Sequence, residues 1–113
     1  GLDSPERRPA PGQRMAEEAF RALRDEIMRG PTTVLVYGVD RYGRSLCIVI
    51  DSTGYVVNLW LVESGFAETY MLENSPFSAG LRAAEARAQK EKRGIWGLTP
   101  YESPSSYRKR MKN

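Results

Sequence analysis

The chain has 113 residues, 41% of them hydrophobic, and a formal net charge of +3, which indicates one domain with a modest core. It contains no histidine and a single cysteine, Cys47, which excludes internal disulfides, cysteine zinc clusters and catalysis by histidine. Any hydrolytic chemistry would therefore depend on carboxylates, arginines, water and a hard metal ion.

The charge is spread unevenly. Residues 81–113 hold nine lysines and arginines against three acidic residues, whereas residues 31–80 hold two against five. A basic end favours anionic partners, but a solvated, solubilising tail accounts for the same charge. No apolar run approaches the roughly 20 residues of a membrane span, so we expect no span.

The first 12 residues include three prolines and predict a loop. A helix is expected over residues 13–29, ended by the Gly-Pro pair at residues 30–31. Its apolar side chains recur at three- and four-residue spacing, which predicts a face packed in the core. These side chains are Met15, Ala16, Ala19, Phe20, Leu23 and Ile27.

Two β-rich runs follow, over residues 33–37 and 44–51, separated by a short polar break that predicts a hairpin turn. Arg44 opens the second run, and its guanidinium fork suits a phosphate, which it can bind through two parallel bonds. The alternative is a solvated turn charge. Cys47 lies within the second run, where a small buried hydrophobe is expected rather than a nucleophile.

The second half of the chain predicts a short helix over residues 56–64, with Gly65 as its left-handed stop. Asn58 lies within this apolar segment and is expected to tie loops together, because a buried amide needs hydrogen-bond partners. Residues 66–74 are expected to be extended or irregular.

The last predicted helix covers residues 76–92, with a Ser75-Pro76 start and a Gly94 stop. After it, Ile95 and Trp96 are expected to fold back onto the core. The basic tail, residues 98–113, is expected to be mobile.

Three stretches occur in a specific order: DSPE at residues 3–6, DRYGR at residues 40–44 and EARAQKEKRGIW at residues 85–96. This order resembles the staphylococcal nuclease (thermonuclease) family, with its Asp-[Thr/Ser]-Pro-Glu loop, Asp-Lys-Tyr-Gly-Arg turn and Ile-Trp ending. The residue pair 57–58 and the stretch VESGFA at residues 62–67 also match. The resemblance covers residues 1–97 and leaves a basic tail with prolines and serines at residues 98–113.

The resemblance implies an α+β fold of the OB type, a five-stranded β-barrel with helices packed on it. It also implies Ca²⁺-dependent hydrolysis of phosphodiester bonds in DNA and RNA. A hard cation takes oxygen ligands, and phosphodiester hydrolysis needs a positioned water and positive charge at the phosphate oxygens. The residue types in the matched motifs agree with those needs.

Residue by residue, the resemblance makes Asp3 a calcium ligand through its carboxylate and Ser4 one through its backbone carbonyl. Glu6 matches the carboxylate that activates or orients the attacking water, and Arg44 the arginine that binds the phosphate. Without the resemblance, the expected roles of Asp3 and Glu6 are an Asx-turn and a charge on a loop.

The resemblance also implies a nucleotide-binding role for two tyrosines, Tyr42 and Tyr70. Arg41 lies beside Tyr42 in the same turn and is expected to contact the substrate.

The chain departs from the family at its N-terminus. The family has strands before the Asp-[Thr/Ser]-Pro-Glu loop, and they carry a second metal-binding aspartate and a second phosphate-binding arginine. Here that loop begins at residue 3. We therefore expect a barrel that is incomplete at the N-terminus, with exposed apolar surface and self-association.

Two other functions remain open at the level of sequence. An OB-derived module can bind nucleic acid or protein without catalysis, through a basic groove and aromatic platforms. A nonfunctional remnant that folds by exchanging strands with its own copies is the third possibility.

Overall fold

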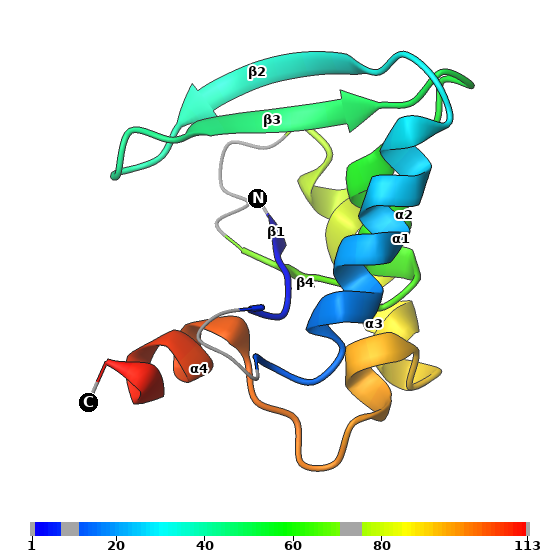
Figure 1. Ribbon diagram of the computed structural model, residues 1–113. Coiled ribbons are helices and arrows are strands. Elements are labelled where there is room, and N and C mark those ends of the chain that lie inside the picture. Colours follow the sequence, from blue (N-terminus) through cyan, green and yellow to red (C-terminus); the bar gives the residue numbers. More distant parts are fainter. Residues whose placement is uncertain (1, 8–11, 71–75, 113) are drawn as a thin grey trace.

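The computed structural model describes residues 2–7, 12–70 and 76–112, and Figure 1 shows their arrangement. The expected extended residues 71–74 and the expected cap Ser75 lie outside these ranges. The elements in chain order are β1 (Leu2–Asp3), α1 (Ala16–Met28), β2 (Thr33–Val39), β3 (Ser45–Ile50), α2 (Val57–Glu63), β4 (Glu68–Thr69), α3 (Ser78–Lys90), the 3₁₀ turn η1 (Gly94–Gly97) and α4 (Pro104–Met111).

The predicted hairpin and the three predicted helices are present, with helix ends two or three residues inside the expected limits at most. Strands β2 and β3 pair antiparallel from Thr33 opposite Ile50 to Val39 opposite Ser45, with an irregularity between Val36 and Gly38. A second antiparallel pair joins β1 to β4 below the hairpin (Figure 1). The fold is therefore α+β with small antiparallel sheets, and a five-stranded barrel stays a prediction.

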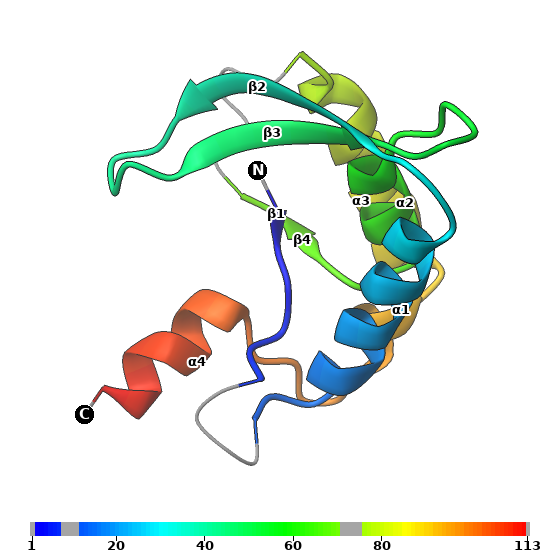
Figure 2. The same ribbon diagram turned by 45° about the horizontal axis from the view of Figure 1, so that its top comes forward.

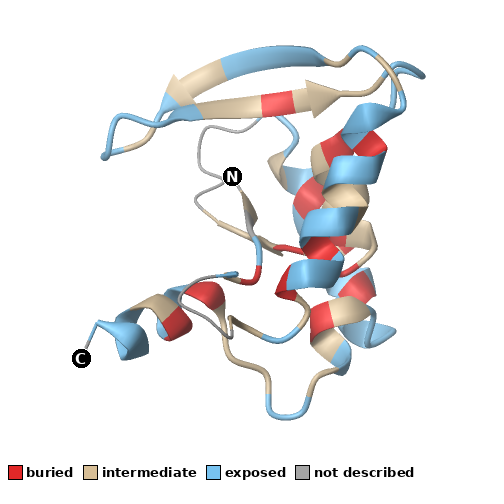
Figure 3. Cartoon of the chain, in the orientation of Figure 1, coloured by how far each residue is buried: buried red, intermediate tan, exposed pale blue. Residues whose placement is uncertain are grey.

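The core lies where the helices meet. Val62 of α2 packs with Leu81 and Ala84 of α3, and the half-buried Leu2 of β1 packs against this cluster. Figure 3 shows buried positions gathered on α1, α2 and α3, whereas β2 is largely exposed. The expectation that the chain folds back after the last helix is confirmed at Ile95, which is fully buried.

Gly65 has a positive φ of 77°, which confirms the predicted left-handed stop of α2. A methyl group at this position would lie 2.2 Å from the carbonyl oxygen of Arg93, so only glycine fits. The close approach lets the Gly65 carbonyl accept a hydrogen bond of 2.8 Å from the Ile95 amide. The end of α2 is thereby locked to the segment after α3.

Asn58 confirms the expected tying role, although it connects a strand to a helix rather than two loops. Its Oδ1 accepts a hydrogen bond from the Val49 amide at 2.8 Å, and its Nδ2 donates to the Cys47 carbonyl at 3.0 Å. These bonds fix β3 to α2. Cys47 itself is only half-buried, which corrects the expectation of a buried hydrophobe.

The apolar face of α1 is less buried than its spacing predicts. Ala16 and Ala19 are buried, but Phe20 and Ile27 are 41% and 39% exposed. The Arg7 guanidinium lies 3.8 Å from the centre of the Phe20 ring and partly covers it. Spacing identified the correct face, but among the described residues no element covers all of it.

The expectation of a mobile tail is wrong for residues 104–111, which form α4 (Figure 2). Ser103 caps the helix by accepting a hydrogen bond from the Ser106 amide, and Pro104 occupies the first turn. Pro104 and Tyr107 are both buried, so the helix is held by apolar packing as well as by its cap. None of the helices in the described ranges has the length and apolar character that crossing a membrane requires.

A carboxyl pair links the end of α1 to the end of β3. Glu26 is buried, and a hydrogen bond with Asp51, followed by burial, raises its pKa above the ordinary value of 4.5, although the charge of Arg29 opposes the shift. Hydrogen bonds from Thr53 and Glu26 hold the Asp51 pKa well below its usual range. Folding therefore shifts the equilibrium of Glu26 toward its protonated form.

This pair predicts a pH-dependent gain in stability from Glu26→Gln. Because folding raises the pKa of Glu26, its contribution is fully present below about pH 4.5 and is lost as the pH rises through the folded pKa. Gln keeps the hydrogen bond without ionising, so the variant should melt above wild type near pH 7 and match it near pH 4. Thermal melts by circular dichroism across this range check the prediction. A melting-temperature difference independent of pH would contradict it.

Candidate active site

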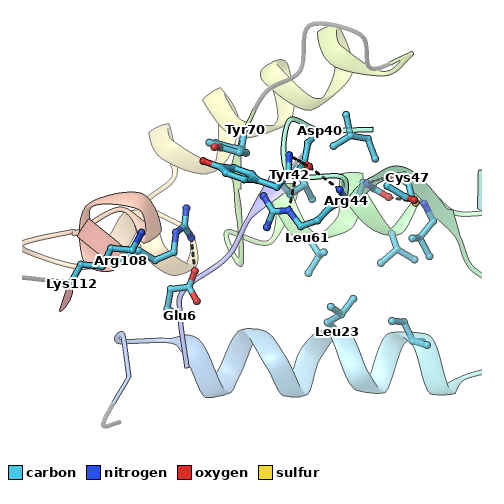
Figure 4. A pocket seen from close by; sticks show the side chains of 17 residues that line it. Glu6, Leu23, Asp40, Tyr42, Arg44, Cys47, Leu61, Tyr70, Arg108 and Lys112 are labelled. Carbon is cyan, nitrogen blue, oxygen red and sulfur yellow. Dashed lines mark hydrogen bonds and ion pairs between the residues drawn. The ribbon is translucent and has the colours of Figure 1, made fainter. Parts of the chain in front are cut away.

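A cavity of about 980 Å³ opens between the hairpin, α1 and α4, and Figure 4 shows the side chains that line it. Its floor is mainly apolar and is formed by α1, α2 and β3. Its charged groups and tyrosines come from four separate parts of the chain: Glu6, Asp40, Tyr42, Arg44, Tyr70, Arg108 and Lys112. Four of the seven predicted site residues, namely Glu6, Tyr42, Arg44 and Tyr70, therefore lie around one cavity.

The turn between β2 and β3 is organised by the Asp40 carboxylate. Its Oδ1 accepts hydrogen bonds from the Tyr42 amide at 2.8 Å and the Arg44 amide at 2.9 Å. Its Oδ2 accepts from Arg44 Nε at 2.7 Å, and the Asp40 side chain is only 6% exposed. The Arg44 amide and then the Arg44 side chain lower the pKa of Asp40, so the carboxylate is charged at neutral pH.

Arg44 is held by this carboxylate at one nitrogen only. Its side chain remains 68% exposed, and within the described residues its only ion pair is that with Asp40. The Arg44 guanidinium also lies 5.4 Å from the centre of the Tyr42 ring. An arginine oriented through Nε can offer its terminal nitrogens to an anion, as bidentate phosphate binding requires.

Glu6 is held on the opposite side of the cavity. Its amide donates to Gln13 Oε1 at 3.1 Å, and its carbonyl accepts from the Gln13 amide at 2.7 Å. Its carboxylate pairs with the Arg108 guanidinium of α4, as Figure 4 shows. The carboxylate is 30% exposed, so water can reach it.

Of the remaining predicted residues, Ser4 and Arg41 do not line the cavity, and the Asp3 side chain is not among those that the structure describes. Asp3 pairs with Glu68 in the β1–β4 ladder, and its side chain lies outside what the structure describes. Ser4 follows β1 and is exposed. Arg41 is exposed in the hairpin turn, with its guanidinium 5.0 Å from the Tyr42 ring centre.

The donor types suit a hard cation, but the described donors are few. The carboxylates among the side chains that line the cavity are those of Glu6 and Asp40, each paired with an arginine, and the described ranges contain no cluster of three or more metal-binding side chains. Ca²⁺ takes roughly six to eight oxygen ligands. Water and groups beyond the described side chains would have to complete such a site.

Sequence reasoning missed three polar groups of the cavity. Asp40 was part of a recognised motif, and its spacing to Arg44 is the signal for an Asx-type turn. Arg108 and Lys112 lie in the segment expected to be mobile. The four-residue spacing of these two residues could have indicated a shared helix face.

The chain folds into a small α+β domain in which two arginines, two carboxylates and two tyrosines line one open cavity. Residues 1–97 match the model of the family described as staphylococcal nuclease homologue, and the chain belongs to this nuclease family.

The relatives carry nuclease names. The chain is 30% identical over 120 residues to a probable endonuclease LCL3 of Eremothecium gossypii, covering 98% of this chain and 44% of that protein. It is 28% identical over 120 residues to a micrococcal nuclease of Shigella flexneri, covering 99% of this chain and 67% of that protein. It is 43% identical over 60 residues to endonuclease YhcR of Bacillus subtilis, covering 50% of this chain and 5% of that protein. The chain thus spans less than half of the first of these relatives.

The geometry predicts that Asp40→Ala loosens the turn that carries Arg44, whereas Asp40→Asn preserves it. Asn keeps an oxygen that can accept from the Tyr42 and Arg44 amides, but Ala removes both bonds. Hydrogen exchange at the Arg44 amide, measured by NMR, should accelerate at least tenfold in the Ala variant and little in the Asn variant, because exchange follows local opening. Equal exchange in wild type and Asp40→Ala would show that the carboxylate does not hold the turn.

Proposed function

We propose that the protein is a metal-dependent nuclease that hydrolyses phosphodiester bonds in DNA and RNA. The observation that supports it best is that Glu6, Arg44 and two tyrosines line the same cavity, in a chain that belongs to a nuclease family. A cavity with an apolar floor and a few convergent polar groups is typical of ligand sites.

In this mechanism Arg44 binds the scissile phosphate. Charge builds on the phosphoryl oxygens as the bond breaks, and an oriented guanidinium stabilises that charge at no cost in reorganisation. The Asp40 carboxylate supplies the orientation through Nε. Glu6 orients or deprotonates the attacking water as a general base.

The proposed cofactor is Ca²⁺. Asp3 and the Ser4 carbonyl are the groups of this chain that would hold it, because both offer hard oxygen donors. When bound, the ion would add positive charge at the phosphate. Tyr42 and Tyr70 would contact the nucleotide, and Arg41 would contact the substrate at the edge of the turn.

A binding module without catalysis is the second candidate. The ion pair between Glu6 and Arg108 favours it, because Arg108 occupies part of the carboxylate that the nuclease mechanism assigns to the attacking water. DNA binding without cleavage in the presence of Ca²⁺ would support this function over the nuclease.

We also propose that the fold is of the OB type and that the exposed hairpin is covered by further protein. Val34, Leu35, Val36 and Val39 of β2 are each at least half exposed. A two-stranded hairpin with open apolar faces is marginally stable alone, so association through β2 would stabilise it.

The proposed roles predict distinct kinetic defects. Arg44→Lys keeps the charge but loses the planar fork, so kcat should fall on the order of a hundredfold. Glu6→Gln should retain substrate binding and lose rate, whereas Asp3→Ala should raise the Ca²⁺ concentration needed for activity. Steady-state cleavage at varied Ca²⁺ distinguishes the three.

Arg24→Lys is the matched control for Arg44→Lys, because Arg24 is an exposed arginine of α1 paired with Asp25 and does not line the cavity. It should cleave at the wild-type rate. Wild-type rates in Arg44→Lys, Glu6→Gln and Asp3→Ala would remove these residues from the active site.

The exposed β2 surface predicts self-association of the 113-residue chain. Light scattering over a concentration series should give a mass that rises with concentration, because apolar side chains leave water on association. Val36→Lys, at a position 62% exposed, should lower that mass, because a charge on the strand opposes association. A wild-type chain that stays monomeric and melts cooperatively would rule out association through β2.

A further inference from the structure

Helix α4 lies outside residues 1–97, the part that matches the nuclease family, yet it forms one side of the cavity. Arg108 and Lys112 are four residues apart, so they share one face of the helix, and both line the cavity. Lys109 and Arg110 do not line it, and Arg110 instead pairs with Glu102 at 2.9 Å. Two of the four basic side chains in residues 108–112 thus line the cavity.

The position of α4 is fixed by contacts to the rest of the domain. The Tyr101 hydroxyl donates to the Glu68 carboxylate of β4 at 2.6 Å, and the Tyr101 ring centre lies 5.1 Å from that of Trp96. Gln13 Nε2 donates to the Glu102 carbonyl just before the helix. Since Tyr107 is buried as well, Arg108 approaches the cavity on an anchored element and not on a loose tail.

The charges around the cavity favour an anionic ligand. Three cations, Arg44, Arg108 and Lys112, face two carboxylates, Asp40 and Glu6. Asp40 is occupied by Arg44 and by two backbone amides, and Glu6 is paired with Arg108. Lys112 is exposed and makes no ion pair within the described residues. The cavity therefore carries a net charge of +1, which lies on the α4 side, while on the opposite side the exposed Arg44 is paired with Asp40 through one nitrogen only (Figure 4).

We propose that α4 is a second phosphate-binding arm, in which Arg108 and Lys112 bind a backbone phosphate of the nucleic acid while Arg44 binds the scissile one. On substrate binding, Arg108 exchanges the Glu6 carboxylate for the phosphate, and Glu6 becomes available to the attacking water. This inference rests on the proposed function for its substrate, but its test reads binding and not cleavage.

The test uses the 113-residue chain and a fluorescein-labelled single-stranded DNA oligonucleotide in EDTA, so that no cleavage occurs. Anisotropy titrations over a NaCl series give the affinity and its salt slope. Arg108→Gln should weaken binding about tenfold at low salt and reduce the slope of log K against log [salt] by about one, since one phosphate contact is lost. Lys112→Gln should act in the same direction.

Lys109→Gln is the matched control, because it removes the same charge from the same helix away from the cavity. Its affinity should stay within about twofold of wild type, since it takes away long-range charge but no phosphate contact. If Arg108→Gln only lowers the melting temperature and leaves affinity and slope unchanged, α4 is a structural clamp and the proposal fails. Faster cleavage in Ca²⁺ with unchanged affinity would make Arg108 an inhibitory contact and would equally overturn the proposal.

The outcomes separate this inference from the proposed function. A wild type that binds DNA without cleaving it, together with weakened Arg108→Gln binding, supports the arm and rejects the nuclease. A wild type that cleaves DNA and an Arg108→Gln variant that binds it equally well support the nuclease and reject the arm. Should Arg108→Gln fail to fold, Lys112→Gln decides, because its exposed side chain can be replaced without disturbing the core, and unchanged binding there overturns the proposal.

Discussion

The amide of Asn58 is the interaction on which the candidate site depends most. The helical core is formed by α2 and α3, but Arg44 lies on a hairpin whose own faces are poorly covered. Two hydrogen bonds from one side chain hold the backbone of β3 at Cys47 and Val49 against α2. An amide can do this where an apolar residue cannot, because it donates and accepts at once. The hairpin thereby takes its position from the core.

The turn at residues 40–44 is, in contrast, almost self-contained. Asp40 accepts hydrogen bonds from the Tyr42 amide, the Arg44 amide and the Arg44 side chain, all within four residues of itself. The geometry of the turn therefore depends on local sequence. The core sets where the turn is, and the turn sets how Arg44 is held. A change in either would move the guanidinium, but only a change in the core would move the cavity floor as well.

Local interactions also explain how much could be predicted from sequence. The hairpin, the helices α1, α2 and α3 and the left-handed Gly65 follow from spacing and stop signals that act within a few residues. The exposure of Phe20 and the docking of α4 do not, since both depend on what packs against them. Arg108 meets Glu6 across almost the whole length of the chain, and no local pattern reports such a contact. The side of the site formed by the family motifs was therefore predictable, and the side formed by α4 was not.

The pairing of Glu6 with Arg108 also changes how the site would work. The Arg108 guanidinium occupies part of the Glu6 carboxylate, so an attacking water would have to share that group with the ion pair. A phosphate can compete with the partly exposed Glu6 carboxylate for that guanidinium, because both anions offer oxygens in the fork geometry that arginine matches. Substrate would then both fill the cavity and release the base. Such an exchange of ion pairs would couple the activation of water to the presence of a phosphodiester.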